Sequence, residues 1–205
     1  MNDRRRLTQL VFTLAAVTTM GVFSLSARAE IADVDINATS TFATGDISDI
    51  GSPSLGARAS VRFIITPQLS LGVVGNVQRQ SISSSDTETY NQATTLGVSS
   101  YGLTGRFSFG VPEWPTRPFL GLDGGLANFS TGGDADFAPL PLKTKSSGFF
   151  LAPQIGLDTQ LVPRVHLEIA FIYQYLHTSD PLEVGGELLQ DLSGAGFFAG
   201  IAVPL

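Results

Sequence analysis

The sequence predicts an all-β protein, an eight-stranded antiparallel up-and-down transmembrane β-barrel with short periplasmic turns and long extracellular loops. Three observations support this prediction. Eight stretches alternate large apolar residues with small or polar ones, their connections are alternately long and short, and neither of the two lysines falls in a stretch. Because successive side chains of a strand point to opposite faces, each stretch has one apolar and one mostly polar face.

The eight stretches are about as long as strands that cross a bilayer. In chain order they are 31–42, 55–65, 69–80, 95–110, 118–130, 149–161, 165–175 and 195–205. The clearest is 165–175, whose odd positions are all large and apolar or aromatic. A helical period would place Glu168 and Gln174 among those apolar residues, so a strand is favoured.

Two residues do not fit this alternation. Val98 is apolar at a polar position, which predicts a β-bulge near Ser99 or Ser100. Pro153 cannot donate a ladder hydrogen bond, which predicts a second bulge inside 149–161.

The connections differ in kind. Three are short and contain proline, at 66–68, 111–117 and 162–164, whereas 43–53, 81–94, 131–147 and 178–191 are long and polar. The last of these is expected to be an acidic loop. Short turns at one end and long loops at the other are the layout of bacterial outer-membrane barrels.

The first 29 residues have the pattern of a secretory signal peptide. Three arginines at 4–6 precede a mostly apolar run at 7–25, and Ala27-Arg28-Ala29 is a cleavage site of the A-x-A kind. The alternative, an uncleaved anchor, is disfavoured by the threonines in the run. We therefore expect a signal peptide at 1–29 and one barrel domain at 30–205.

Composition excludes several classes of protein. The chain has no cysteine, which removes disulfides, Cys-ligated zinc and thiol catalysis. Its net charge of −6 argues against a nucleic-acid partner. No pattern of metal ligands and no phosphate-binding glycine loop is present, so we expect no metal and no cofactor.

Charged residues on the polar face of the strands predict a network inside the barrel. The six are Arg58, Arg62, Arg106, Asp123, Asp158 and Glu168, three of each sign, and Asp33 and Asp35 add negative charge near the start. Buried ions must be paired, and an eight-stranded barrel is just filled by its side chains. We expect a plugged lumen; the alternative is a narrow small-solute channel.

Aromatic residues are expected to form two interfacial girdles. Phe63, Phe107, Phe109 and Trp114 lie near the short turns, and Phe42, Tyr101, Tyr173 and Tyr175 lie toward the long loops.

The strands 117–126 (RPFLGLDGGL) and 167–175 (LEIAFIYQY), with the signal peptide, resemble the small outer-membrane barrels related to OmpA, OmpX and the opacity-type surface antigens. Phe198, Gly200, Val203 and Leu205 are spaced like the terminal signal for the barrel-assembly machinery. Leu205, where an aromatic is usual, and Pro204 depart from that signal.

The resemblance implies a monomer in the outer membrane of a Gram-negative bacterium, in contact with lipid and lipopolysaccharide. It implies a structural and surface-interaction role without enzymatic activity. Its extracellular loops would be the binding surface for an extracellular ligand or a host surface.

A second resemblance gives an enzymatic alternative. His177-Thr178-Ser179-Asp180 is similar to the His-x-Ser-Asn stretch of the outer-membrane lipid A deacylases, with Asp180 replacing Asn. It implies His177 as base and Ser179 as nucleophile, with Glu183 or Glu187 orienting the histidine.

Overall fold

The computed structural model describes residues 31–46, 48, 52–83, 93–111, 113–133, 145–184 and 187–205. These residues form nine strands: β1 (Ala32–Ala43), β2 (Ser54–Ile64), β3 (Leu69–Ser83), β4 (Ala93–Ser108), β5 (Thr116–Gly133), β6 (Lys145–Val162), β7 (Val165–Val184), β8 (Glu187–Asp191) and β9 (Gly194–Pro204). Within them there is no helix long and apolar enough to cross a bilayer.

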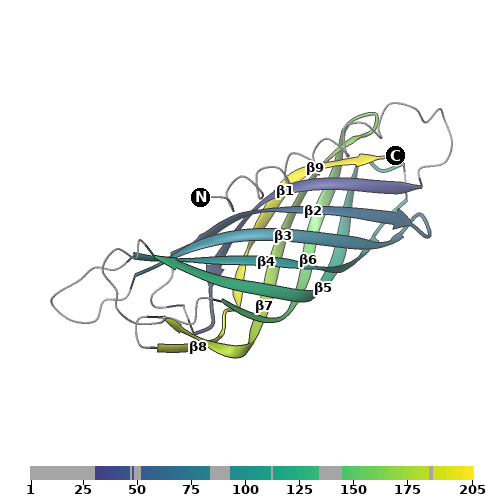
Figure 1. The fold of residues 1–205 in the computed structure, drawn as a ribbon. Helices are drawn as coiled ribbons and strands as arrows, with labels where there is room; N and C mark the ends of the chain where they lie inside the picture. The colour runs from purple at the N-terminus through teal and green to yellow at the C-terminus, as the bar shows by residue number, and fades with distance from the viewer. Residues whose placement is uncertain are drawn as a thin grey trace, which may run out of the picture.

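All strands except β8 form a closed antiparallel ring. Each strand from β1 to β7 pairs with the next, β7 pairs with β9, and β9 pairs back with β1 (Figure 1). The predicted eight-stranded antiparallel barrel is therefore confirmed. One end of the barrel carries the short turns and the described chain ends, and we call it the short-turn end. We call the opposite end the long-loop end.

The two faces of each strand separate as the alternation predicts. On β7, Ile169, Phe171 and Tyr173 are exposed on the outside, whereas Ala170 and Ile172 are buried inside. The eight aromatic residues assigned to girdles are all exposed. An outer surface covered by exposed Leu, Ile, Val and Phe side chains suits contact with lipid rather than with water.

The prediction of a β-bulge near Ser99 and Ser100 is wrong. The pairing of β4 with β3 and with β5 continues through both residues without a change of register. Val98 is simply an inward position, and its buried side chain packs in an apolar cluster inside the barrel. The alternation looked broken because the inward face becomes apolar toward the long-loop end.

The prediction of a β-bulge at Pro153 is also wrong. Pro153 faces outward and pairs with Leu122 of β5. On its other side the β6–β7 ladder has no pairs at 152 and 153 and resumes at Gln154 in the same register. A gap in the ladder thus accommodates the missing N–H. A register shift in this ladder lies nearer the short turn, between Gln160 and Val162.

The acidic loop expected at 178–191 is instead a β-hairpin, the largest difference from the sequence prediction. Strand β7 continues to Val184, and β8 returns beside it with Leu182 opposite Leu189. Leu182, Leu189 and Leu192 are almost completely buried. Acidic and glycine residues between these leucines hid the apolar pattern that makes the hairpin fold over the barrel mouth.

Candidate functional site

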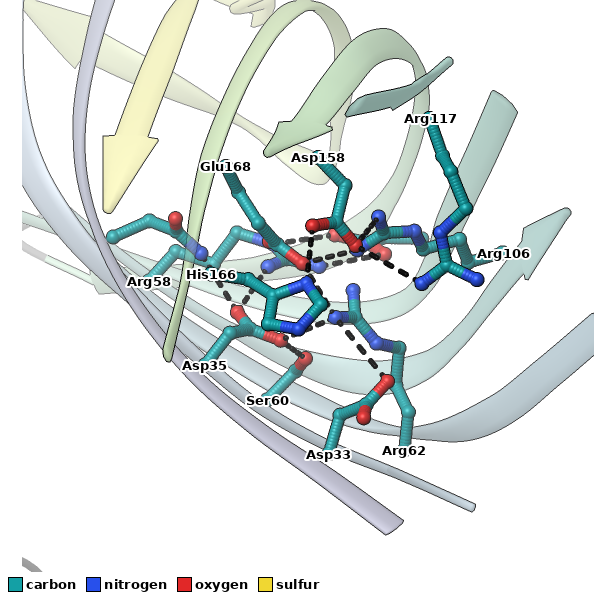
Figure 2. Close-up of polar contacts among 12 residues, drawn as sticks. Asp33, Asp35, Arg58, Ser60, Arg62, Arg106, Arg117, Asp158, His166 and Glu168 are labelled. Carbon is teal, nitrogen blue, oxygen red and sulfur yellow. Dashed lines mark hydrogen bonds and ion pairs between the residues drawn. The ribbon is translucent and has the colours of Figure 1, made fainter. Parts of the chain in front are cut away.

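The lumen is the candidate site, because most of the buried polar and charged side chains lie there. Its centre is Glu168 of β7, whose exposed fraction is 0%. The Glu168 Oε1 atom accepts a hydrogen bond from Arg62 Nη2 at 2.7 Å and another from Arg106 Nη1. Arg106 Nη2 also donates to Asp158 Oδ2 at 2.6 Å (Figure 2).

A second cluster surrounds Arg58. Its Nη1 atom donates to Asp35 Oδ1 at 2.7 Å, and its Nε atom donates to Asp123 Oδ2 at 2.9 Å. Arg62 Nη2 lies 3.3 Å from Asp35 Oδ2, which joins the two clusters. The structure therefore brings the six predicted charges into one network, and Asp35 links its two parts. The Ser60 hydroxyl donates to the same Asp35 carboxylate.

Two phenylalanines support the arginines from inside the barrel. The Arg106 guanidinium lies 3.9 Å from the ring centroid of Phe119, and the Arg58 guanidinium lies 5.2 Å from that of Phe198. Both rings are buried. The sequence prediction missed Phe119 and assigned Phe198 only to the assembly signal. Both residues fall on the mostly polar, small-residue face of their strands, and this position was the signal in the sequence that their rings point into the lumen.

Toward the long-loop end, the lumen changes from ionic to amide and then to apolar. Gln78 Nε2 donates to Gln174 Oε1 at 2.9 Å above the charged network. Buried apolar side chains follow, from Leu96, Val98, Phe129, Phe150, Leu176, Leu182, Leu189 and Leu192. We call these eight residues the apolar cap. A cavity of about 10 Å³ at this level has room for roughly one water molecule.

At the short-turn end the lumen is open. A cavity of about 240 Å³, which we call the vestibule, reaches inward as far as Arg106 and Asp158. Arg117 and His166 line it from β5 and β7. His166 Nδ1 lies 2.7 Å from Asp158 Oδ1, and Arg117 Nη2 lies 3.7 Å from Asp158 Oδ2. In the described residues, no group of three or more His, Cys, Asp or Glu is arranged to hold a metal ion.

The first long connection is fastened to the last one through Asp46. Its Oδ2 atom accepts hydrogen bonds from the backbone N–H groups of Gln190 and Asp191, each at 2.8 Å. Thr44 N–H donates to the Ser193 carbonyl at 2.8 Å. The hydrogen bonds from Asp191 and Gln190 lower the pKa of the Asp46 carboxyl below its ordinary value.

Loss of this carboxylate should loosen the end of β8. Because the folded-state pKa of Asp46 is lowered, its stabilising effect is present at neutral pH and is lost as pH falls through that pKa. We expect Asp46→Ala to speed hydrogen exchange of the Gln190 and Asp191 amides at neutral pH by on the order of threefold, since the carboxylate is solvent-screened.

Amide exchange, normalised to unstructured peptide rates, checks this effect at neutral and acidic pH. The wild-type amides should lose protection on acidification more steeply than those of Asp46→Ala. Equal protection in both proteins at neutral pH would show that Asp46 does not hold the hairpin.

Two residues of the enzymatic alternative, His177 and Ser179, lie on the outer surface. His177 and Ser179 face outward on β7, two positions and therefore about 6.6 Å apart along the strand. The His177 ring packs beside Phe149 and Tyr175, with centroid separations of 5.3 and 6.3 Å. The described hydrogen bonds do not join His177 to Ser179. The side chains of Glu183 and Glu187 lie outside the described part.

The residues of the expected assembly signal all lie on β9 or directly after it. Phe198 points into the lumen, whereas Val203 is an outward position that pairs with Val34 of β1. Leu205 N–H donates to the Ala32 carbonyl at 2.7 Å, which fixes the end of β9 against β1. Gly200 pairs with Asn37 and Glu168, one on either side.

Comparison with known proteins supports the fold. No protein-family model and no curated protein sequence matches the chain. Among solved structures, Neisserial surface protein A (NspA) superposes with a TM-score of 0.58 at 16% identity, over 85% of this chain and 97% of that one. The outer membrane protein OprG of Pseudomonas aeruginosa superposes with a TM-score of 0.57 at 11% identity, over 88% of this chain and 98% of the OprG chain.

A third similar structure is Ail, the attachment invasion locus protein of Yersinia pestis, solved in complex with the heparin analogue sucrose octasulfate. It gives a TM-score of 0.51 at 14% identity, over 86% of this chain and 99% of that one. Identities this low compare folds and not activities. The chain has the fold of the small bacterial outer-membrane β-barrels, as the sequence resemblance implies.

Proposed function

We propose that this protein is a monomeric outer-membrane barrel of a Gram-negative bacterium, with a structural role in the envelope and a binding surface made by its extracellular loops. In this proposal residues 1–29 are a cleaved signal peptide. The barrel-assembly machinery inserts the chain, with 198–205 as its signal. The short-turn end faces the periplasm, and the outer surface contacts lipid and lipopolysaccharide.

The observation that carries this proposal is the closed lumen. The Glu168 and Arg58 clusters cross the barrel interior, and the apolar cap fills it at the long-loop end. Opening a path would separate buried ion pairs and expose the buried leucines, both of which cost free energy. A closed scaffold leaves the loops as the surface for interaction.

The charge of the long connections favours a basic partner. They carry Asp46, Asp49, Asp86, Glu88, Asp134, Asp136, Asp180, Glu183, Glu187 and Asp191 against two lysines, Lys143 and Lys145. Ail, whose fold is similar, was solved with a sulfated heparin analogue. We expect this acidic surface to repel such a polyanion and to attract cationic ligands or divalent cations.

Heat modifiability tests the proposal. Outer-membrane fractions would be run on a gel with and without boiling. A closed barrel should appear in the outer membrane and should migrate differently before boiling. Recovery of the protein from the periplasm with unchanged mobility would contradict an outer-membrane barrel and would favour a soluble ligand-carrying barrel.

The closed lumen also predicts an absence of conductance. The purified protein, inserted in planar bilayers at neutral pH, should give no single-channel currents above the bilayer background. Regular current steps from protein that is heat-modifiable on the gel would contradict the closed lumen and support the small-solute channel.

Lipid A should be chemically unchanged by the protein. The described geometry shows His177 packed on aromatic rings and not hydrogen-bonded to Ser179, and it therefore does not favour a deacylase. Mass spectra of lipid A from cells with and without the protein should agree. Loss of an acyl chain that is abolished by Ser179→Ala would establish the enzymatic alternative instead.

A further inference from the structure

The vestibule has incompletely paired charges on its walls. It is open at the short-turn end and has a volume of about 240 Å³. Five ionisable side chains line it: Asp33, Arg106, Arg117, Asp158 and His166. The arrangement of their partners decides what the vestibule can bind.

One wall, formed by β3, β4 and β5, has hydrogen-bond donors to spare. Arg106 uses Nη1 on Glu168 and Nη2 on Asp158, but its Nε atom is buried without a partner among the described residues. Among the described residues, Arg117 has a single ionic contact, with Asp158 at 3.7 Å, and its side chain is partly exposed. The hydroxyls of Ser70 and Ser108 also line the cavity.

The ring of Phe119 packs against the Arg106 guanidinium. Its centroid lies 3.9 Å from the guanidinium carbon, a cation–π contact that helps to hold the Arg106 side chain on this wall. The Nε atom of Arg106 is buried, so the donors that a ligand in the vestibule can reach are those of Arg117, Ser70 and Ser108.

The opposite side of the vestibule carries a carboxylate with little to hold it. Asp33 of β1 has one ionic contact within the described part of the chain, with Arg62 Nη2 at 4.0 Å, and its side chain remains partly exposed. Asp158 differs, because Arg106, Arg117 and His166 already surround its two oxygens. Because β1 and β5 are four strands apart in both directions around the eight-stranded ring, Asp33 and Arg117 come from opposite walls of the barrel.

We propose that the vestibule binds small zwitterions, molecules that carry one carboxylate and one ammonium group, such as an amino acid or a dipeptide. The carboxylate binds the Arg117 guanidinium, with the Ser70 and Ser108 hydroxyls beside it. The ammonium group binds Asp33. Charge-assisted hydrogen bonds of this kind are the stronger ones in proteins.

The balance of charge selects against simple ions. A simple anion is attracted by Arg117 but repelled by Asp33 and Asp158. A simple cation is attracted by these carboxylates but repelled by Arg117. A zwitterion matches both walls at once. The size of the ligand is also limited, because the Glu168 cluster closes the vestibule on the side toward the barrel centre.

Titration of the folded, detergent-solubilised barrel tests the proposal, with diglycine as the probe and binding followed by NMR. N-acetylglycine lacks the ammonium group and glycinamide lacks the carboxylate. We expect saturable binding of diglycine and at least about tenfold weaker binding of either analogue, the factor that 1.4 kcal/mol represents.

Two variants assign the two ends of the ligand. Arg117→Gln should weaken diglycine at least about tenfold and should also weaken N-acetylglycine. Asp33→Asn should weaken diglycine and leave N-acetylglycine no weaker than before. Arg79→Gln, at an exposed arginine on the outer face of β3, is the matched control and should change nothing. Each variant must remain heat-modifiable, so that misfolding is not mistaken for lost binding.

The proposal fails if the heat-modifiable wild-type barrel shows no saturable shifts with diglycine. It also fails if N-acetylglycine or glycinamide binds as tightly as diglycine, or if neither Arg117→Gln nor Asp33→Asn weakens diglycine.

Discussion

Glu168→Gln should lower the free energy of unfolding of the barrel by about 3 to 5 kcal/mol, the usual cost of breaking a buried ion pair by removing one partner. The substitution keeps the size of the side chain and removes its charge. Arg62 and Arg106 would then lie in the lumen without the carboxylate that both contact. Urea unfolding in detergent, followed by the loss of the fast-migrating band, measures the change.

The large effect follows from the place of Glu168 in the network. It joins β7 to Arg62 of β2 and to Arg106 of β4 across the lumen, and none of the three is exposed to solvent. Glu113→Gln is the matched control, because Glu113 is exposed beside a short turn and should be nearly neutral. If Glu168→Gln had the same urea midpoint of unfolding as the wild type, the network would not stabilise the barrel.

Leu189→Ala should open the β7–β8 hairpin. Leu189 is 1% exposed in the apolar cap, and removal of a buried leucine side chain costs about 2 to 5 kcal/mol. A cost of about 2 kcal/mol raises the open population roughly thirtyfold. Limited proteolysis of the folded barrel should therefore cut within 182–191 on the order of thirty times faster, while the ring of strands remains intact.

The neighbouring residue provides the control. Leu188 lies on the same strand but is 69% exposed, so Leu188→Ala should leave the cleavage rate close to that of the wild type. Equal cleavage of both variants would contradict the burial of the hairpin over the barrel mouth. It would restore the solvated acidic loop that the sequence alone predicts.

The barrel itself could be predicted because strand alternation is a local property. The period of two in 165–175 recurs in seven other stretches, and each maps onto a strand of the ring. The hairpin could not be predicted in the same way. Its buried leucines at 182, 189 and 192 lie among acidic and glycine residues, and their burial depends on Phe129, Phe150 and other side chains from distant strands.

The charged residues of the site could also be named from their strand faces, but their partners could not. Arg62 and Glu168 lie 106 positions apart in sequence and meet only because the ring places β2 across the lumen from β7. Asp35 looked peripheral because it is near the beginning of the strands, yet it links the two clusters. Which donors remain unpaired, such as Arg106 Nε, depends on this three-dimensional arrangement.

Two adjacent residues of β6 allow the most direct test of which face contacts lipid. The chain has no cysteine, so single spin labels can be placed at Ile155→Cys and Gln154→Cys. Ile155 is 58% exposed on the outer surface, and Gln154 is 6% exposed in the lumen. In reconstituted bilayers, the label at 155 should collide freely with oxygen and little with a water-soluble nickel reagent, whereas the label at 154 should be shielded from both. A label at 155 that is open to the nickel reagent would place the apolar face outside the lipid and would contradict the transmembrane barrel.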